Sequence, residues 1–358
     1  MAKTRKTKVI NVGGVPVGGG NPVVVQSMTK TNTTDVRATL AQIRRLAKEG
    51  CELVRVAVPD RRALACLGEI VGKSPVPVIA DIHYSSGLAI GSLEAGAACV
   101  RVNPGNLGGR GEFRKVALAA RRLGRAVRIG VNEGSLDPAI IRKRDLSASE
   151  KMVESAMLYL ETAGKTGLED VKLSLKSSDV INTIGAYKAI AQRTDLPLHI
   201  GITEAGDVFS GSIRSGVGLG ILLAGGIGDT IRVSLTAPPE TEVRAAWEIL
   251  RSLGLRKRGV ELISCPTCSR CEQDTMKIVE KVRKQTAGIE KPMRVAVMGC
   301  GVNGPGECEA SDAGLVMAAS GRALLYVGGK VVGRVPAASA ADELAAAVNK
   351  LAVPKGGE

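Results

Sequence analysis

Aromatic side chains are scarce in this sequence: Phe, Trp and Tyr together make up 2% of its 358 residues. Proteins that bind single-stranded nucleic acid stack bases on aromatic side chains, so this scarcity disfavours nucleic acid as a partner. No run of roughly 18 apolar residues occurs, which argues against a membrane-spanning helix. The basic start, MAKTRKTKVI, lacks the apolar stretch that follows in a secretory signal. We therefore expect a cytoplasmic protein that binds neither nucleic acid nor membrane.

Negative charge is also in short supply, because 49 Lys and Arg residues face 35 Asp and Glu residues, a formal net charge of +14. Such an excess suits nucleic acid, a polyanionic small molecule or an acidic protein, unless it only keeps the surface soluble. Apolar residues make up 44% of the chain, enough to bury a full core. Since 358 residues exceed one ordinary domain, we expect one large and one small domain.

Eight strand–helix units are predicted in the first part of the chain. The expected strands are 22–27, 53–58, 76–81, 99–103, 127–132, 171–175, 198–202 and 230–235, and the expected helices are 34–48, 60–71, 86–96, 111–123, 147–164, 179–193, 214–225 and 240–253. Near-continuous Val, Ile and Leu in the strands is typical of parallel strands buried on both faces. Eight such units predict an α/β fold, a (β/α)8 TIM barrel over residues 1–253, with a doubly wound open sheet as the alternative. Thr34 is the expected N-cap of the first helix, and both chain ends are expected to be frayed tails.

Polar residues gather where the expected strands end. They are Arg55, Asp81, His83, Arg101, Asn103, Arg128, Asn132, Lys172, Ser174, Lys176, Thr203, Glu204, Arg232 and Ser234. Active sites of TIM barrels lie at the carboxyl ends of the strands. Arg and Lys together there suit a phosphate or diphosphate group. Taken singly, each residue is better explained as a solvated strand end or a helix N-cap, but polar residues at seven strand ends together favour a functional ring. His199 is expected to be a core or supporting residue.

A glycine-rich stretch, GDVFSGSIRSGVGLG at 206–220, follows the seventh expected strand. Its Gly216, Gly218 and Gly220 are a weak indication of dinucleotide binding, because the strand–turn–helix context is missing. The stretch is expected either to form a loop whose amides approach phosphate, or to supply glycines for helix packing.

A second, α+β domain is expected over residues 260–358, after a linker at 254–259 (GLRKRG). The expected strands are 260–264, 293–298, 315–318, 323–327 and 331–335, and the expected helices are 271–285 and 340–351. Gly328–Gly329 suits the two-residue turn of a hairpin.

Five of the eight cysteines lie in two short segments of this second domain: SCPTCSRC at 264–271 and VAVMGCGVNGPGEC at 295–308. In a reducing compartment, clustered thiolates favour a metal or iron–sulfur centre over disulfides. Cys265, Cys268 and Cys300 are the natural ligands, whereas Cys271, Cys308 and Glu307 compete for the fourth position. A structural zinc site is the alternative, and it yields a rival function, a basic nucleic-acid-binding protein with a zinc module.

Segments spread over nearly the whole chain resemble the 4-hydroxy-3-methylbut-2-enyl diphosphate synthases, iron–sulfur enzymes of the methylerythritol phosphate route to isoprenoids. They are MTKTNTTD (28–35), DIHY (81–84), VRVNPGN (100–106), IGVNEGSL (129–136), VKLSLKSSD (171–179), HIGITEAG (199–206), GIGDTIRVSLT (226–236), SCPTC (264–268) and MGCGVNGPGE (298–307). The length fits the short bacterial two-domain form of the family.

The resemblance implies a TIM barrel followed by a smaller α+β, sulfite-reductase-like iron–sulfur domain. It also implies a 4Fe-4S cluster held by Cys265, Cys268, Cys300 and Glu307. The reaction would be reductive opening and dehydration of 2-C-methyl-D-erythritol 2,4-cyclodiphosphate, with electrons from reduced flavodoxin or ferredoxin. The family further implies a homodimer in which the cluster domain of one chain caps the barrel of the other.

By the same resemblance, the polar strand ends acquire roles. Seven of them are expected to bind the diphosphate: Arg55, Arg101, Asn103, Arg128, Asn132, Lys172 and Lys176. Asp81, His83 and Glu204 are expected to lie near the carbon skeleton, and Ser174 is expected to contact the substrate. Glu204 is the expected proton donor, since acid assistance is needed when oxygen leaves as water. Glu307 is expected to act in catalysis because a carboxylate is more easily displaced from a soft iron than a thiolate. A barrel enzyme for pterins or phosphosugars, with a merely stabilising cysteine domain, is a second rival.

Overall fold

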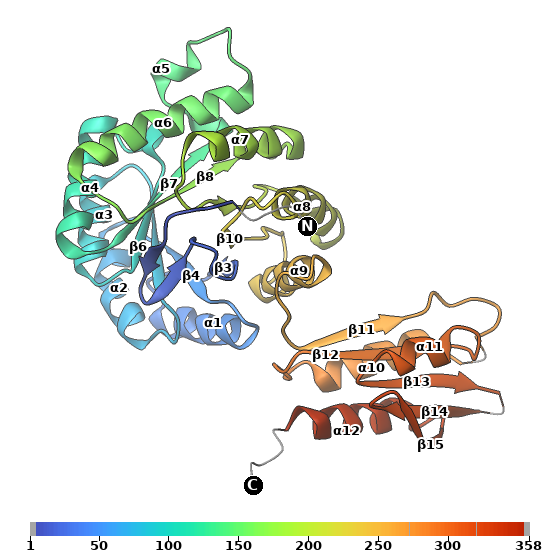
Figure 1. Ribbon diagram of the computed structural model, residues 1–358. Helices are drawn as coiled ribbons and strands as arrows, with labels where there is room; N and C mark the ends of the chain where they lie inside the picture. The colour runs from blue at the N-terminus through green and yellow to red at the C-terminus, as the bar shows by residue number, and fades with distance from the viewer. Residues whose placement is uncertain (1–4, 272, 320, 354–358) are drawn as a thin grey trace. The chain divides into compact units, whose positions relative to one another are not determined.

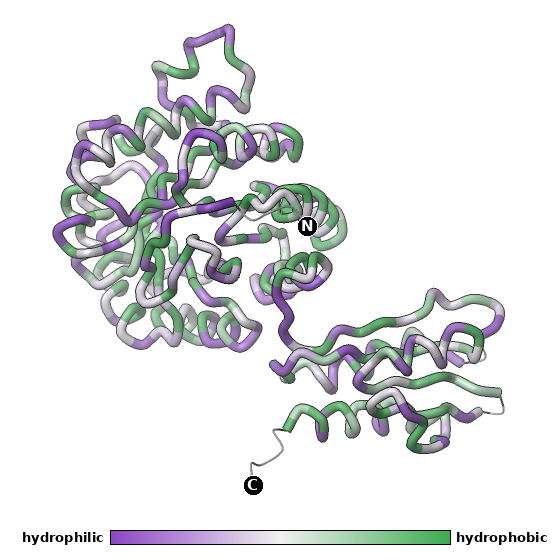
Figure 2. Tube along the Cα trace, in the orientation of Figure 1, coloured by the Kyte–Doolittle hydropathy of each residue, from purple (hydrophilic) through white to green (hydrophobic). Residues whose placement is uncertain are grey.

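The chain forms two compact units, Met1–Arg256 and Lys257–Glu358, in a computed structural model that describes residues 5–271, 273–319 and 321–353 (Figure 1). The division falls within the segment 254–259. This connection is hydrophilic in Figure 2, in keeping with Arg256, Lys257 and Arg258. No helix of the described residues is both long and apolar enough to cross a membrane.

The first unit is a TIM barrel, as predicted. Its parallel strands run in the order β8-β7-β6-β5-β4-β3-β10-β9, and an isolated parallel bridge between Leu173 and Leu198 joins the two ends. The strands are β3 (Val24–Met28), β4 (Leu53–Ala57), β5 (Val78–Ile82), β6 (Cys99–Val102), β7 (Ala126–Asn132), β8 (Val171–Lys176), β9 (His199–Ile200) and β10 (Thr230–Ile231). The sheet therefore closes on itself, which excludes the open doubly wound alternative.

Helices surround the strands (Figure 1). They are α1 (Val36–Lys48), α2 (Arg61–Lys73), α3 (Ser86–Glu94), α4 (Arg110–Leu123), α6 (Ala148–Thr166), α7 (Val180–Arg193), α8 (Val208–Ala224) and α9 (Pro239–Ser252), with the short α5 (Pro138–Ile141) before α6. Asp35, and not the expected Thr34, caps α1: its carboxylate accepts a hydrogen bond from the Ala38 backbone N–H at 2.9 Å. A capping residue of this kind satisfies an amide that the helix leaves unpaired.

A short antiparallel hairpin, β1 (Ile10–Val12) and β2 (Val15–Val17), closes the amino ends of the barrel strands. Ile10, Val12 and Val17 pack with the first inward residues of the strands, which are Val24, Leu53, Ile79, Cys99 and Ala126. The expectation of a frayed start is wrong from Arg5 onward, because the Arg5 side chain donates to the carbonyls of Ala191, Thr194 and Leu196. Residues 1–4 and 354–358 lie outside the described residues.

The glycine-rich stretch is helical, so the expected phosphate-binding loop is wrong. Helix α8 starts at Val208, where the Asp207 side chain accepts from the Ser210 N–H at 2.8 Å. A Cβ atom at Gly218 would lie 2.8 Å from Ile202 Cδ1, closer than packed atoms come. At this position the packing interpretation is confirmed.

Among the described residues of the second unit, a five-stranded sheet in the order β11-β12-β13-β14-β15 packs with three helices. Its elements are β11 (Val260–Ser264), α10 (Thr275–Thr286), β12 (Met293–Met298), α11 (Gly304–Glu309), β13 (Ala313–Ala318), β14 (Arg322–Val327), β15 (Lys330–Pro336) and α12 (Ala340–Ala352). Val295 and Val297 pack in one core with α10 and α12, whereas Ala296 and Met298 pack in another with Cys308 of α11. Since side chains alternate along a strand, α11 lies on the opposite face of the sheet. Helix α10 begins at Thr275, so the expectation that Cys271 starts it is wrong.

Candidate active site

Four charged side chains stand in one row across neighbouring strands of the barrel. Asp81 pairs in register with Arg101, Arg101 with Arg128, and Arg128 with Lys172. Residues paired in a parallel ladder point to the same face of a sheet. The apolar alternates, such as Val100 and Val127, pack outward against the helices, so the charged row faces the barrel interior.

Asp81 is the acidic centre of this row. Its carboxylate lies 3.3 Å from Arg101 Nη1 and 3.7 Å from Arg55 Nη1, and His83 Nε2 is 3.7 Å away. Burial opposes ionisation, but Arg55, His83 and Arg101 outweigh it and hold the pKa of Asp81 below its usual range. Asp81 therefore remains a carboxylate that orients two guanidinium groups.

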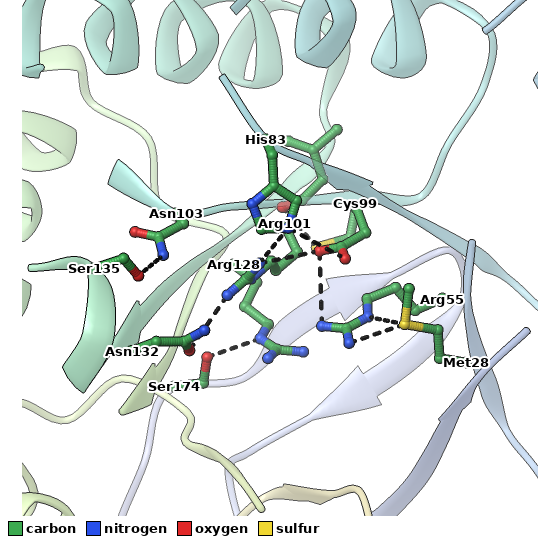
Figure 3. A network of polar contacts seen from close by, with 12 residues as sticks. Met28, Arg55, His83, Cys99, Arg101, Asn103, Arg128, Asn132, Ser135 and Ser174 are labelled. Carbon is green, nitrogen blue, oxygen red and sulfur yellow. Dashed lines mark hydrogen bonds and ion pairs between the residues drawn. The ribbon is translucent and has the colours of Figure 1, made fainter. Parts of the chain in front are cut away.

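Further polar contacts fix the other predicted residues (Figure 3). Arg128 Nε donates to Ser174 Oγ at 3.0 Å, and Arg101 Nη2 donates to Asn132 Oδ1 at 3.4 Å. Asn103 Nδ2 donates to Ser135 Oγ at 2.5 Å. Arg55 instead points two nitrogens at the sulfur of Met28, at 3.0 and 3.2 Å. A thioether is a weak acceptor, so the Arg55 guanidinium keeps most of its capacity for a stronger one.

Positive charge is in excess inside the barrel. The cationic ring, as we name it, consists of Arg55, Arg101, Arg128, Lys172, Lys176 and Arg232. Its members contact two buried carboxylates, Asp81 and Glu242. Arg128 is 1% and Lys172 0% exposed, yet Arg128 Nη1 and Lys172 Nζ have no hydrogen-bond partner among the described residues. Buried charges are ordinarily paired, so the ring is arranged to receive an anion.

The pKa values express this excess. Burial and the charge on Arg128 lower the pKa of Lys172 to about 8. Burial, together with Arg128 and Arg232, lowers the pKa of Lys176 well below its ordinary value. An anion that binds inside the barrel therefore stabilises the charged form of each lysine. A diphosphate matches both the positive charge and the N–H donors of the cationic ring.

Lys30 and Glu242 also belong to these contacts and were not predicted from the sequence. Glu242 on α9 accepts from Lys30 Nζ at 2.9 Å and from the Leu235 N–H at 3.0 Å, and it lies 3.7 Å from Arg232 Nη2. An acid within a helix gives no sequence indication of such a role, because only the fold brings it to β10. Gly130 was missed as well: a Cβ there would lie 2.5 Å from Arg101 Nε, so glycine leaves room for that guanidinium.

Glu204, the expected proton donor, lies apart from these contacts. It is exposed on the loop after β9, and no hydrogen bond or ion pair among the described residues joins it to the cationic ring. Its backbone is left-handed, with φ of +51°. Non-glycine residues rarely adopt this conformation, and such strain is concentrated at functional sites.

The predicted thiol site occupies the ends of two adjacent parallel strands of the second unit. Cys265 follows β11 and Cys300 follows β12. The Gly299 N–H donates to Cys265 Sγ at 3.1 Å, and a Cβ at Gly299 would meet Cys271 Sγ and lie 3.2 Å from Cys265 Sγ. Glycine is thus required there if sulfur atoms are to approach the backbone.

Both positively and negatively charged side chains lie around the thiols. The Arg270 guanidinium donates a hydrogen bond to Cys300 and lies near Cys268. These two thiols raise the pKa of Arg270. Glu307 Oε2 is 3.3 Å from Arg294 Nη2. Cys308 is fully buried on α11, and burial with nearby Glu307 and Glu309 raises its pKa to about 12. Cys308 thus lies in the hydrophobic core, whereas Cys271 remains beside Cys265.

The eight cysteines are free thiols. Among the described residues, no three His, Cys, Asp or Glu side chains are gathered closely enough to hold a metal ion, and Glu307 is paired with Arg294. The donor set nevertheless fits an iron–sulfur cluster: soft thiols on two adjoining loops, a backbone N–H directed at a sulfur, and a glycine that leaves space beside them.

Comparisons with known proteins cover both units. Residues 7–247 match the family described as "GcpE TIM-barrel domain", and residues 261–350 match "GcpE protein C-terminal domain". A Geobacter sulfurreducens protein named 4-hydroxy-3-methylbut-2-en-1-yl diphosphate synthase (flavodoxin) is 51% identical over 98% of this chain and 99% of its own length. An Aquifex aeolicus protein of the same name is 50% identical over 96% of each chain.

Solved structures of another enzyme share the barrel. Dihydropteroate synthase from Thermus thermophilus, in complex with 6HMPPP, superimposes with a TM-score of 0.52 at 18% identity, covering 69% of this chain and 98% of that one. The Stenotrophomonas maltophilia enzyme gives 0.52 at 14% identity, over 69% and 99%. At such low identity the likeness shows the barrel fold and nothing about pterins.

Proposed function

The chain belongs to the GcpE family, and on that premise we propose that it is an oxidoreductase that converts 2-C-methyl-D-erythritol 2,4-cyclodiphosphate into 4-hydroxy-3-methylbut-2-enyl diphosphate, with two electrons and loss of water. The reaction belongs to isoprenoid precursor synthesis. Family membership supports this function over the rival of a nucleic-acid-binding protein with a zinc module.

The cationic ring is the observation that carries the proposal. Arg55 and Arg101 are held by Asp81, and Arg128 is held by Ser174, so their positions are set before a ligand arrives. Unpaired N–H groups on Arg128 and Lys172 bind phosphate oxygens and neutralise their charge. A preorganised set of donors costs little reorganisation when charge develops on the departing phosphate oxygen.

The neutral and acidic residues orient the rest of the substrate. Asn103 and Asn132 stand at the carboxyl ends of β6 and β7, beside Ser135 and Arg101. His83 and Asp81 lie next to the carbon skeleton in this proposal. Glu204 donates the proton to the oxygen that leaves as water, after its loop moves toward the ring.

Cys265, Cys268, Cys300 and Glu307 are the proposed ligands of a 4Fe-4S cluster. When bound, the cluster would supply the two electrons and an iron site with affinity for oxygen. Glu307 would be the most readily displaced of the four ligands, since carboxylate suits soft iron less well than thiolate does. The Glu307 carboxylate is paired with Arg294, whose Nη2 atom lies 3.3 Å from Oε2.

The partners follow from the same proposal. Relatives named for flavodoxin indicate a reduced flavodoxin as electron donor, with ferredoxin as the alternative donor. We place the protein in the cytoplasm, where thiols stay reduced. It works as a homodimer in which the cluster domain of one chain caps the barrel of the other, so that water is kept from the reduced intermediate.

Turnover of the cyclic diphosphate tests the function. The protein is purified without oxygen, given a reduced viologen dye and the substrate, and its products are followed by phosphorus NMR. The proposal requires the linear diphosphate to appear. A substrate that stays unchanged, with iron and sulfide present in the protein, contradicts it.

A further inference from the structure

Two buried, uncharged side chains inside the barrel carry polar atoms that have no hydrogen-bond partner among the described residues. Gln26 on β3 is 1% exposed, and neither its Oε1 nor its Nε2 atom has a hydrogen-bond partner among the described residues. His199 on β9 is fully buried, and its Nε2 atom is likewise without a partner. Neither residue has a role in the function proposed above.

Gln26 faces the interior because of the strand alternation of β3. Val24 packs with the inward layer above the hairpin, and Met28 contacts the Arg55 guanidinium. Between them, Val25 packs with the outer core and Ser27 donates to Glu242 on α9. Since side chains alternate, Gln26 shares the inward face with Val24 and Met28.

His199 lies on β9, between β8 and β10, and only β10 separates it from β3 in the strand order. Its Nδ1 atom lies 2.7 Å from Thr230 Oγ1, and the Tyr187 hydroxyl donates to its backbone carbonyl at 2.5 Å. Burial and the charges on Arg128 and Lys176 lower the pKa of His199 well below 6.5, so its imidazole group is neutral. When Nδ1–H donates to Thr230, the free Nε2 atom is an acceptor.

Unpaired polar atoms in a core are unfavourable, and an apolar residue such as Val24 fills the neighbouring inward position. The presence of Gln26 and His199 at inward positions therefore points to a ligand that pairs with their polar atoms. The ring around them offers donors only, because Arg and Lys cannot accept hydrogen bonds. Asp81 is occupied by Arg55, Arg101 and His83. Gln26 Oε1 and His199 Nε2 are therefore acceptors available to a hydroxyl group.

We propose that Gln26 and His199 form a neutral pocket that accepts the free hydroxyl groups of the substrate, while the cationic ring holds its phosphates. This inference rests on the proposed function, since the cyclic diphosphate carries both kinds of group. The pocket would distinguish a polyol diphosphate from a plain diphosphate. A site built to bond a hydroxyl rejects a ligand that lacks it, because its own polar atoms then stay unpaired.

Gln26→Met tests the pocket, because methionine has nearly the same length and no polar atoms. Binding of the cyclic diphosphate and of inorganic diphosphate, which has no carbinol hydroxyl, is measured by calorimetry on the full chain. We expect the affinity for the cyclic diphosphate to fall about tenfold or more and that for inorganic diphosphate to stay within about twofold. The melting temperature of the free variant should stay the same or rise, since an unpaired amide is removed.

Gln42→Met is the matched control. Gln42 is also buried, but its Oε1 atom accepts from the Lys30 N–H at 2.7 Å. This variant should lower the melting temperature and leave the ratio of the two affinities unchanged. Should Gln26→Met fail to fold, His199→Phe carries the same comparison of ligands.

Two results overturn the pocket: an unchanged affinity of Gln26→Met for the cyclic diphosphate, or an equal loss for both ligands. An equal loss for both ligands would mean that Gln26 supports the shape of the site and does not bind a hydroxyl group. Failure of the proposed function looks different, because the unmodified protein would then bind inorganic diphosphate no less tightly than the cyclic diphosphate and would not convert the latter.

Discussion

The backbone N–H of Gly299 donates a hydrogen bond to Sγ of Cys265 at 3.1 Å. This bond ties the loop after β12, which carries Cys300, to the loop after β11, which carries Cys265 and Cys268. Two strands that are parallel neighbours in the sheet therefore bring together cysteines some thirty residues apart in the chain. An N–H directed at sulfur also stabilises a thiolate, the form that binds iron.

Cysteine substitutions should separate ligands from neighbours. We expect Cys300→Ser to lose iron, and Cys308→Ser to keep it while the free energy of unfolding falls by about 1–3 kcal/mol, because a hydroxyl would replace a thiol in the core. Cys271→Ser should also keep iron. Iron and sulfide analysis and thermal melting check these outcomes. If Cys271→Ser loses the cluster and Glu307→Ala keeps it, the proposed ligand set is wrong.

Arg101 should contribute mainly to substrate binding. Arg101→Met removes a charge-assisted contact to phosphate, for which we expect about a 10- to 100-fold rise in KM. Arg122→Met is the control, because Arg122 on α4 is an exposed arginine that pairs with Glu94 at 3.2 Å. Steady-state kinetics should show no change for this control. Equal KM values for the two variants would show that Arg101 does not bind the substrate.

The cation at Lys172 should make binding depend on pH. Its pKa of about 8 in the free protein means that the charged form is lost above that pH. Substrate affinity should therefore fall by up to about tenfold per pH unit above 8, beyond any fall seen in Lys172→Met. Calorimetric titrations from pH 6.5 to 9.5, at roughly unit steps, measure both proteins. Parallel profiles would exclude Lys172 from phosphate binding.

The lowered pKa of Lys172 should also make the free energy of unfolding rise with pH. Between the folded pKa of about 8 and the unfolded value of 10.5, the unfolded chain binds more protons at Lys172, so stability rises with pH. At pH 7 the charged amine is buried at a cost, and Lys172→Met should raise the free energy of unfolding by up to about 3 kcal/mol. That gain should shrink as the pH approaches 10 in urea titrations. A destabilised variant at pH 7 would contradict the unpaired state of Lys172.

The sequence predicted the strands of the barrel and the polar residues at their ends, because apolar runs of fixed spacing report directly on burial. It failed where tertiary packing overrides local preference. Three-residue strands such as Ile10–Val12 are too short to recognise, although they close the barrel floor. The glycines of α8 suggested a loop, but Gly218 serves a close contact with Ile202. Glu242 and Gln26 gain their roles only through neighbours distant in the chain.

Mixing two impaired variants should test the proposed dimer, at a substrate concentration well below the raised KM of Arg101→Met. An Arg101→Met chain has an impaired barrel and an intact cysteine domain, and a Cys300→Ser chain has the reverse. If the cluster domain of one chain serves the barrel of the other, heterodimers contain one complete site, and activity should return after mixing and re-association. Each variant re-associated with itself is the control. An absence of regained activity in verified heterodimers would count against the arrangement.

We propose that an iron–sulfur centre in the second unit and the cationic ring in the first act on one cyclic diphosphate. Preparations that differ only in iron content, made by graded reconstitution without oxygen, test it most directly. We expect iron and sulfide in equal amounts, and a rate of linear diphosphate formation that rises in proportion to them. Product formation by iron-free protein, or zinc as the metal of the active preparation, would contradict it.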